Sequence, residues 1–81
     1  MFLSTNLKFL RKRKSVSQTD LAKTLELSRT TLIGYEKGVQ PPFAKLIRIA
    51  EHFKVSLDAL VRYDLTKLSA FQLSEIEKVS K

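Results

Sequence analysis

Three side chains near the middle of the chain have types and spacing suited to binding a partner rather than to building a core. Arg29, Thr30 and Ile33 stand at the i, i+1 and i+4 positions that share one side of a helix. A guanidinium, a hydroxyl and a branched alkyl group in this order offer hydrogen bonds and apolar contact, but they make no evident catalytic set. Core packing does not require them, so the spacing predicts a recognition surface.

Catalysis and metal binding have little support elsewhere in the sequence. The chain has no cysteine, which excludes disulfides and thiolate metal sites, and its single histidine, His52, is expected to be a surface residue of a helix. There is no glycine-rich phosphate loop, and the serines are better explained as helix caps. We therefore predict a protein that is not an enzyme and has no metal, cofactor or evident small-molecule site.

Two short helices are predicted to position the recognition side chains. Ser17 is a suitable N-cap for a helix over residues 18–25, with an inward stripe formed by Leu21, Ala22 and Leu25. The break that follows is two residues long. It is too short for the two helices to lie antiparallel.

Ser28 is predicted to cap the second helix, which extends to about residue 37. Leu32 and Tyr35 are expected to face the core, and Gly38 can adopt the left-handed conformation that ends a helix. The side expected to face solvent consists of Arg29, Thr30, Ile33 and Gly34.

This segment resembles the helix-turn-helix of the Cro/cI family of phage and bacterial repressors, which is also called XRE-like. The matching pattern is S-Q-x-x-L-A-x-x-L-x-L-S-R-x-T-L-x-x-Y-E-K-G, and the similarity extends over about residues 7–60. In that family the second helix lies in the DNA major groove, and the N-terminus of the first helix crosses the phosphate backbone. The resemblance implies an all-α fold, a five-helix lambda-repressor-like domain.

The resemblance also implies roles for individual residues. The side chains expected at DNA are Arg29, Thr30 and Ile33 for bases and Gln18, Thr31 and Lys37 for phosphates. Arg11 and Glu36 are expected to pair and to brace the first helix against the end of the second helix of the motif. Gly34 has two interpretations, a tolerant position near a helix end or a close approach of the backbone to DNA.

The remaining helices are predicted from caps and apolar stripes. Thr5 or Asn6 is expected to cap a first helix that extends to about residue 14, Pro41-Pro42 to begin a helix that extends to about residue 53, and Ser56 to cap the last core helix. The apolar positions expected on the fourth helix are Phe43, Leu46, Ile47, Ile49, Ala50 and Phe53.

The chain divides into residues 1–62, the DNA-binding domain, and residues 63–81, a C-terminal extension. An S-x-x-Q capping box at residues 69–72 predicts a helix in the extension. Its apolar stripe consists of Leu65, Leu68, Leu73, Ile76 and Val79. We expect residues 65–81 to help form a homodimer, because Leu73, Ile76 and Val79 have no assigned place in the five-helix core. The alternatives are that this segment packs on its own domain or frays.

The net charge of +7 lies entirely on the first part of the chain. Residues 1–62 contain 12 basic and 5 acidic residues, and residues 63–81 contain 3 of each. This distribution favours a polyanionic partner over an anionic membrane surface or mere solubility. There is no apolar run long enough to span a membrane and no signal peptide, so a cytoplasmic location is expected.

These observations lead to one functional hypothesis and one alternative. The protein is predicted to be a sequence-specific regulator of transcription that binds double-stranded DNA as a homodimer on a palindromic operator. The family resemblance alone indicates that it is a repressor. The alternative is a protein-interaction module, or the antitoxin of a toxin-antitoxin pair, with the same fold.

Overall fold

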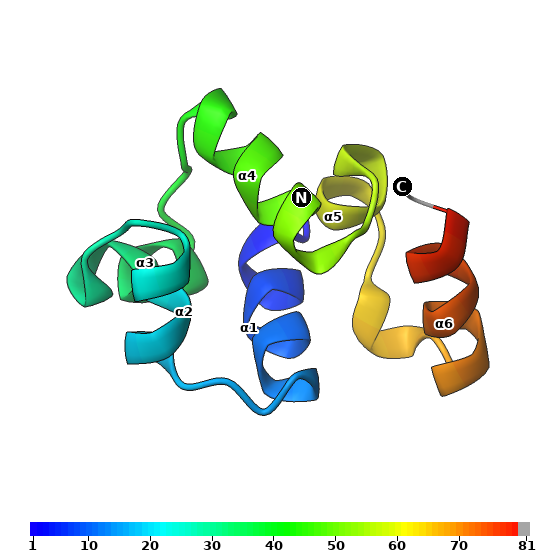
Figure 1. Ribbon diagram of the computed structural model, residues 1–81. Coiled ribbons are helices and arrows are strands. Elements are labelled where there is room, and N and C mark those ends of the chain that lie inside the picture. The colour runs from blue at the N-terminus through cyan, green and yellow to red at the C-terminus, as the bar shows by residue number, and fades with distance from the viewer. Residues whose placement is uncertain (80–81) are drawn as a thin grey trace.

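The computed structural model describes residues 1–79, with side chains up to residue 76, and over this range every regular element is a helix (Figure 1). The elements are α1 (Leu3–Arg13), α2 (Gln18–Thr24), α3 (Arg29–Glu36), α4 (Phe43–Phe53), α5 (Leu57–Arg62), the 3-10 turn η1 (Leu65–Lys67) and α6 (Ala70–Val79). No strand occurs in the described residues, and the predicted all-α class is confirmed. In Figure 1, α1 stands at the centre, with α2 and α3 on its left and α5, η1 and α6 on its right.

Three serine caps start the helices at the positions that the sequence predicts. The hydroxyl of Ser17 accepts from the backbone N–H of Asp20 at 3.0 Å, and that of Ser28 accepts from the N–H of Thr31 at 3.0 Å. Ser56 caps α5 in the same way through Ala59 at 2.9 Å. Each hydroxyl satisfies one backbone N–H that has no partner within its helix.

Helices α1 to α4 end with the same backbone motif. A residue one or two positions past the helix has a positive φ, and the N–H of the next residue donates to the carbonyl five residues before it. Only one of these residues is a glycine, Gly38, with φ of 115°. The other three are Ser15, Glu26 and Lys54, with φ of 58°, 59° and 57°. The short break between α2 and α3 is therefore made by Glu26 in a conformation that glycine usually occupies.

The expected cap of the first helix is wrong. α1 begins at Leu3, and Asn6 lies inside the helix with no exposed surface. Its amide nitrogen donates to the carbonyls of Leu60 and Tyr63 at 2.7 and 2.6 Å, and its amide oxygen accepts from the N–H of Leu65 at 3.0 Å. Asn6 thus ties α1 to the end of α5 and to η1, a long-range contact that local sequence signals do not indicate.

The apolar core contains most of the predicted stripes but not all of the predicted stripe of α4. The side chains with at most 1% exposure include Leu7, Leu10, Leu21, Leu32, Ile49, Phe53 and Leu60. Phe43 and Ile47 belong to the predicted apolar stripe of this helix, but they are 65% and 37% exposed. The N-terminal half of α4 projects beyond the helices beneath it (Figure 1), so the apolar spacing continues past the core that it could cover.

The C-terminal extension packs on its own domain. The capping box forms, with Ser69 N–H donating to Gln72 Oε1 at 2.9 Å and Gln72 N–H donating to Ser69 Oγ at 3.2 Å. Leu73 is buried in the main core, and Ile76 packs against it. The expectation that these two side chains form a free apolar surface is therefore wrong, and the side chain of Val79 lies outside the described residues.

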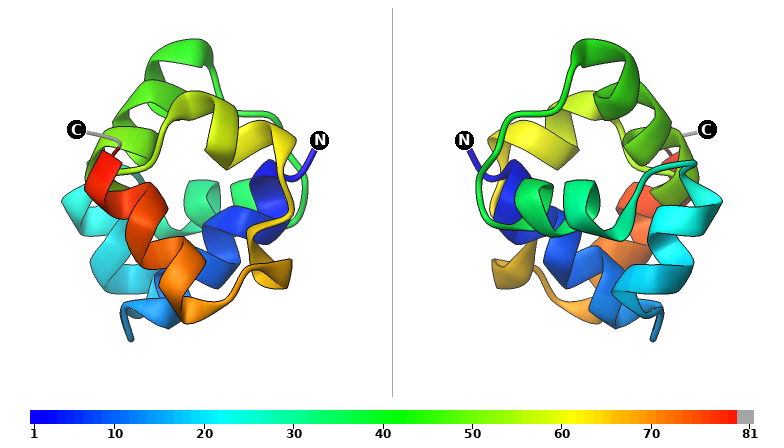
Figure 2. Two further views of the ribbon diagram at one scale, coloured as in Figure 1. Left: turned by 90° about the vertical axis from the view of Figure 1, so that its right-hand side faces the viewer. Right: turned by 90° about the vertical axis from the view of Figure 1, so that its left-hand side faces the viewer.

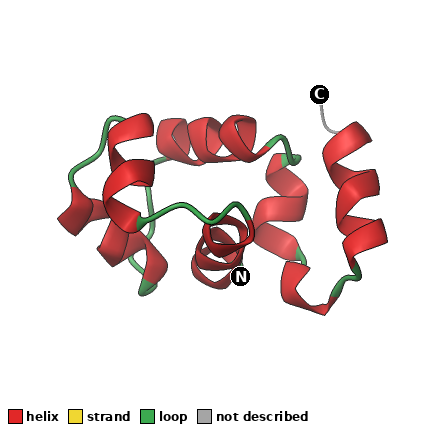
Figure 3. Cartoon of the chain, turned by 60° about the horizontal axis from the view of Figure 1, so that its bottom comes forward, coloured by secondary structure: helices red, strands yellow, loops and turns green. Residues whose placement is uncertain are grey.

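α6 lies at the end of the molecule opposite α2 and α3 (Figure 3). Among the described residues, no helix combines the length and the hydropathy that a membrane span requires.

Candidate nucleic-acid interface

α3 is the helix that carries the side chains predicted to contact bases, and its N-terminal end is exposed. The right-hand view of Figure 2 shows it lying across one face of the molecule, with α2 beside it. Leu32 and Tyr35 are 0% and 6% exposed and anchor its inner side, as the sequence predicts. A helix held by a buried side in this way presents the opposite side to a partner in a fixed orientation.

The outer side of α3 is polar at its N-terminal end and apolar one turn further on. Arg29 and Thr30 are exposed, and Ile33 is half-buried. Thr31 is half-buried as well, and its hydroxyl accepts a hydrogen bond from Ser28 Oγ at 2.8 Å. Lys37 is exposed just past the end of the helix. The side chains expected at bases therefore lie on one side of α3, and those expected at phosphates near its two ends.

Gly34 does not face outward as expected. It is half-buried, and a Cβ at this position would lie 3.5 Å from Cγ2 of Val39, an ordinary van der Waals contact. The missing side chain opens space toward the loop after α3 rather than toward solvent.

A nearly buried ion pair joins α1 to the end of α3. Arg11 Nε lies 2.7 Å from Glu36 Oε2, and Arg11 Nη2 donates to Glu36 Oε1 at 3.2 Å. The side chains of Arg11 and Glu36 are only 10% and 3% exposed. Arg11 Nη1 also donates to the carbonyl of Val16 at 2.9 Å, so the guanidinium holds the α1–α2 connection as well. The structure thus contains the pair that the family resemblance implies.

Gln18 extends this ion pair to the surface of α3. Its Nε2 donates to Glu36 Oε1 at 3.1 Å, and its Oε1 accepts from Arg29 Nη2 at 3.4 Å. A carboxylate only accepts hydrogen bonds, so the amide nitrogen of Gln18 must face Glu36 and the amide oxygen is left for Arg29. From the sequence, Gln18 is predicted to contact a phosphate, and this bridge is not predicted.

The four side chains form a continuous polar chain from the interior to the recognition surface, in the order Arg11, Glu36, Gln18 and Arg29. Gln18 and Arg29 are the first residues of two adjacent helices, and this adjacency is the signal from which their contact could have been inferred. Because each member is held by the one before it, the chain restricts where the guanidinium of Arg29 can point.

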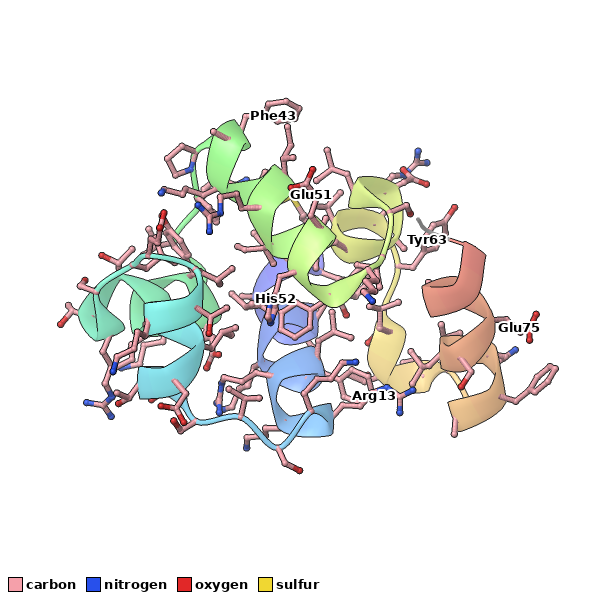
Figure 4. All side chains as sticks on the ribbon, viewed as in Figure 1. Arg13, Phe43, Glu51, His52, Tyr63 and Glu75 are labelled. Atoms are coloured by element: carbon pink, nitrogen blue, oxygen red, sulfur yellow. The ribbon has the colours of Figure 1, made fainter. Side chains whose placement is uncertain are left out.

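The lone histidine takes no part in the interface. His52 is an exposed residue of α4, away from α3, as Figure 4 shows. Desolvation lowers the pKa of His52, and the positive charge of Lys14 lowers it further. No group of three or more potential metal-ligating side chains occurs in the part of the chain that the structure describes.

The capped helix pair and the exposed polar end of its second helix define a helix-turn-helix protein. Comparison with known sequences agrees, because a family model described as helix-turn-helix matches residues 7–60. The chain belongs to this helix-turn-helix family, and its resemblance to the Cro/cI-type, XRE-like regulators is confirmed.

Two relatives share the domain. One is "Uncharacterized HTH-type transcriptional regulator MJ0272" of Methanocaldococcus jannaschii, 38% identical over 63 residues that cover 76% of this chain and 96% of that protein. The other is "Uncharacterized HTH-type transcriptional regulator YqaE" of Bacillus subtilis, 38% identical over 60 residues. This second match covers 73% of the present chain and 52% of YqaE, so the chain spans about half of that relative. No solved structure matches significantly.

Proposed function

We propose that this protein is a sequence-specific regulator of transcription that binds double-stranded DNA and reads the major groove with α3. The observation that carries the proposal is the exposed guanidinium of Arg29 at the start of α3. Its Nη2 donates a hydrogen bond to Gln18 Oε1 at 3.4 Å. Family membership and the names of both relatives, HTH-type transcriptional regulators, support the proposal. The excess of positive charge on residues 1–62 supports it as well.

Arg29 is the first candidate for base readout. A guanidinium in the major groove can donate two parallel hydrogen bonds to O6 and N7 of guanine, which discriminates against a wrong base by about 1–3 kcal/mol. Thr30 is exposed beside Arg29, and Ile33 lies one turn further on, where an apolar side chain can contact the methyl group of thymine.

Phosphate contacts fix the position of α3 without reading sequence. The amide nitrogen of Gln18 donates one of its two hydrogens to Glu36. The second hydrogen can be donated to a phosphate oxygen. Lys37 contributes a full positive charge at the other end of α3, and the hydroxyl of Thr31 is the third candidate.

We propose further that two copies bind a palindromic operator and act as a repressor. One domain of this size contacts only a half-site, and regulators of this kind commonly place two domains about one DNA turn, roughly 34–36 Å, apart. The assignment as a repressor comes from the family resemblance alone. The polar outer side of α3 supports DNA over a protein partner, which is the alternative interpretation of the fold.

A binding selection on random duplex DNA, made at two salt concentrations, tests the proposal. We expect enrichment of a palindromic consensus at both salt concentrations, with weaker affinity at the higher one because phosphate contacts release counterions. Placing the consensus across a reporter promoter then tests repression. If no sequence is enriched at either salt concentration, the protein is not a sequence-specific DNA reader.

A further inference from the structure

Two exposed apolar side chains on α4 have no role in the core or at the DNA-binding side. Phe43 and Ile47 are 65% and 37% exposed and stand one helical turn apart on the same side of α4. Figure 4 shows Phe43 at the free end of α4, pointing away from the rest of the molecule. We refer to Phe43 and Ile47 as the α4 patch.

We propose that the α4 patch is the contact between two copies of this chain bound to the two halves of one operator. The inference rests on the proposed function. It goes further by naming the surface through which the copies meet.

Symmetry limits where that surface can lie. For both α3 helices to reach one DNA duplex, the two-fold axis must run between the two copies and point toward the DNA, so that both copies present α3 on the same side. In the view of Figure 1, this axis runs from the side of α6 to the side of α3. The contact between copies must then lie on a flank between these two sides. The free end of α4 lies on such a flank.

The same argument excludes α6 as the contact. α6 carries the other highly exposed phenylalanine of the described helices, Phe71, with 73% exposure. However, α6 lies at the end of the molecule opposite α3 (Figures 1 and 3). Two copies joined symmetrically through the outer side of α6 would present their α3 helices in opposite directions, and one duplex could not contact both.

The size of the α4 patch indicates a weak contact that forms on DNA. A phenylalanine side chain has about 200 Å² of surface, so Phe43 at 65% exposure leaves about 130 Å² in water. With Ile47, a symmetric pair would bury roughly 400 Å² of apolar side chain, well below the 1,200–2,000 Å² total of a stable interface. The operator must therefore hold the two copies together before the contact is useful.

Charge also favours this surface. The total charge of +7 would make two copies repel each other over most of their surfaces. The row formed by Phe43, Ile47 and the next residue at this spacing, Glu51, contains no cation. Two copies that meet across Phe43 and Ile47 therefore bring together uncharged apolar groups rather than cations.

The test compares two matched variants, Phe43→Ser and Phe71→Ser, with the wild type. Both replaced side chains are highly exposed, so neither change should lower thermal stability appreciably, and thermal unfolding checks this. The affinity of each protein is measured for a duplex with one half-site and for a duplex of equal length with the full palindrome. The ratio between the second and the first binding step gives the cooperativity.

We expect the wild type to bind the palindrome with a cooperativity of about 5–150-fold, the usual range for coupled sites. Phe43→Ser should lower this factor by about fivefold or more while leaving half-site affinity within about twofold, because a central aromatic side chain carries much of a small interface. Phe71→Ser should leave both quantities unchanged.

Three outcomes would overturn the inference. The wild type could bind the two half-sites independently, Phe43→Ser could leave the cooperativity unchanged, or Phe71→Ser could be the variant that lowers it. If the wild type does not bind the half-site duplex at all, the result contradicts the proposed function and not the position of the contact.

Discussion

Replacement of Asn6 by alanine gives the most direct test of how this fold is held together. The side chain is completely buried, and it makes three hydrogen bonds, to the carbonyls of Leu60 and Tyr63 and from the N–H of Leu65. Alanine removes the amide and leaves these backbone groups without that partner. Each buried group left unsatisfied costs about 1–3 kcal/mol. We therefore expect Asn6→Ala to lower the free energy of unfolding by about 3–5 kcal/mol.

This magnitude separates a buried residue from a helix cap. If Asn6 were an exposed N-cap, as the sequence suggests, its replacement would cost about 1 kcal/mol. For a domain of this length, the total free energy of unfolding is about 4–12 kcal/mol. A loss of 3 kcal/mol or more would lower Tm by at least about 12 °C. Such a change is large enough to measure by either heat or urea.

Urea denaturation of the wild type and of Asn6→Ala measures the effect, provided that the slope m stays constant. Thr5→Ala is the matched control, because Thr5 is the neighbouring exposed residue and the other candidate cap. We expect its effect to stay within about 0.5 kcal/mol. A loss of 1 kcal/mol or less for Asn6→Ala would refute the reasoning, as would equal losses for the two variants.

Further predictions concern the DNA-binding side. Arg29→Ala should flatten the preference at one position of each half-site by about 1–3 kcal/mol while changing non-specific binding less, and an unchanged consensus in the binding selection would show that Arg29 does not read a base. Lys37→Ala should weaken binding to all sequences alike and reduce the salt slope by about one unit, whereas Gln18→Ala should weaken binding with almost no change of slope, since an amide releases no counterion. Gly34→Ala should raise the free energy of unfolding by about 0.5–1 kcal/mol because the added methyl group packs on Val39. Operator affinity should stay nearly constant, and a clear loss would support the interpretation in which Gly34 lets DNA approach.

The sequence predicts the local parts of this structure well. The caps at Ser17, Ser28 and Ser56 form because a serine hydroxyl finds its partner three residues along the same chain. The left-handed end at Gly38 follows from the residue type alone. The pairing of Arg11 with Glu36 is long-range, and only the family resemblance made it visible.

What the sequence does not show depends on where separate helices meet. Asn6 lies on the same stripe as Leu3, Leu7 and Leu10, which is a sign of burial, but nothing nearby in the chain identifies the end of α5 as its partner. The bridge formed by Gln18 needs the relative position of α2 and α3. To predict that Phe43 is exposed, one must know where the core beneath α4 ends. The apolar stripe continues past that point and does not show it.

The helix ends at Ser15, Glu26 and Lys54 also bear on how the protein could be engineered or could evolve. A residue other than glycine in the left-handed region costs about 1 kcal/mol of stability. The three positions together therefore lower the free energy of unfolding by a sizeable part of what a small domain has. Glycine at each of them would release that strain. None of the three belongs to the recognition side of α3. Greater thermal tolerance is therefore accessible to this protein without altering a side chain proposed to contact DNA.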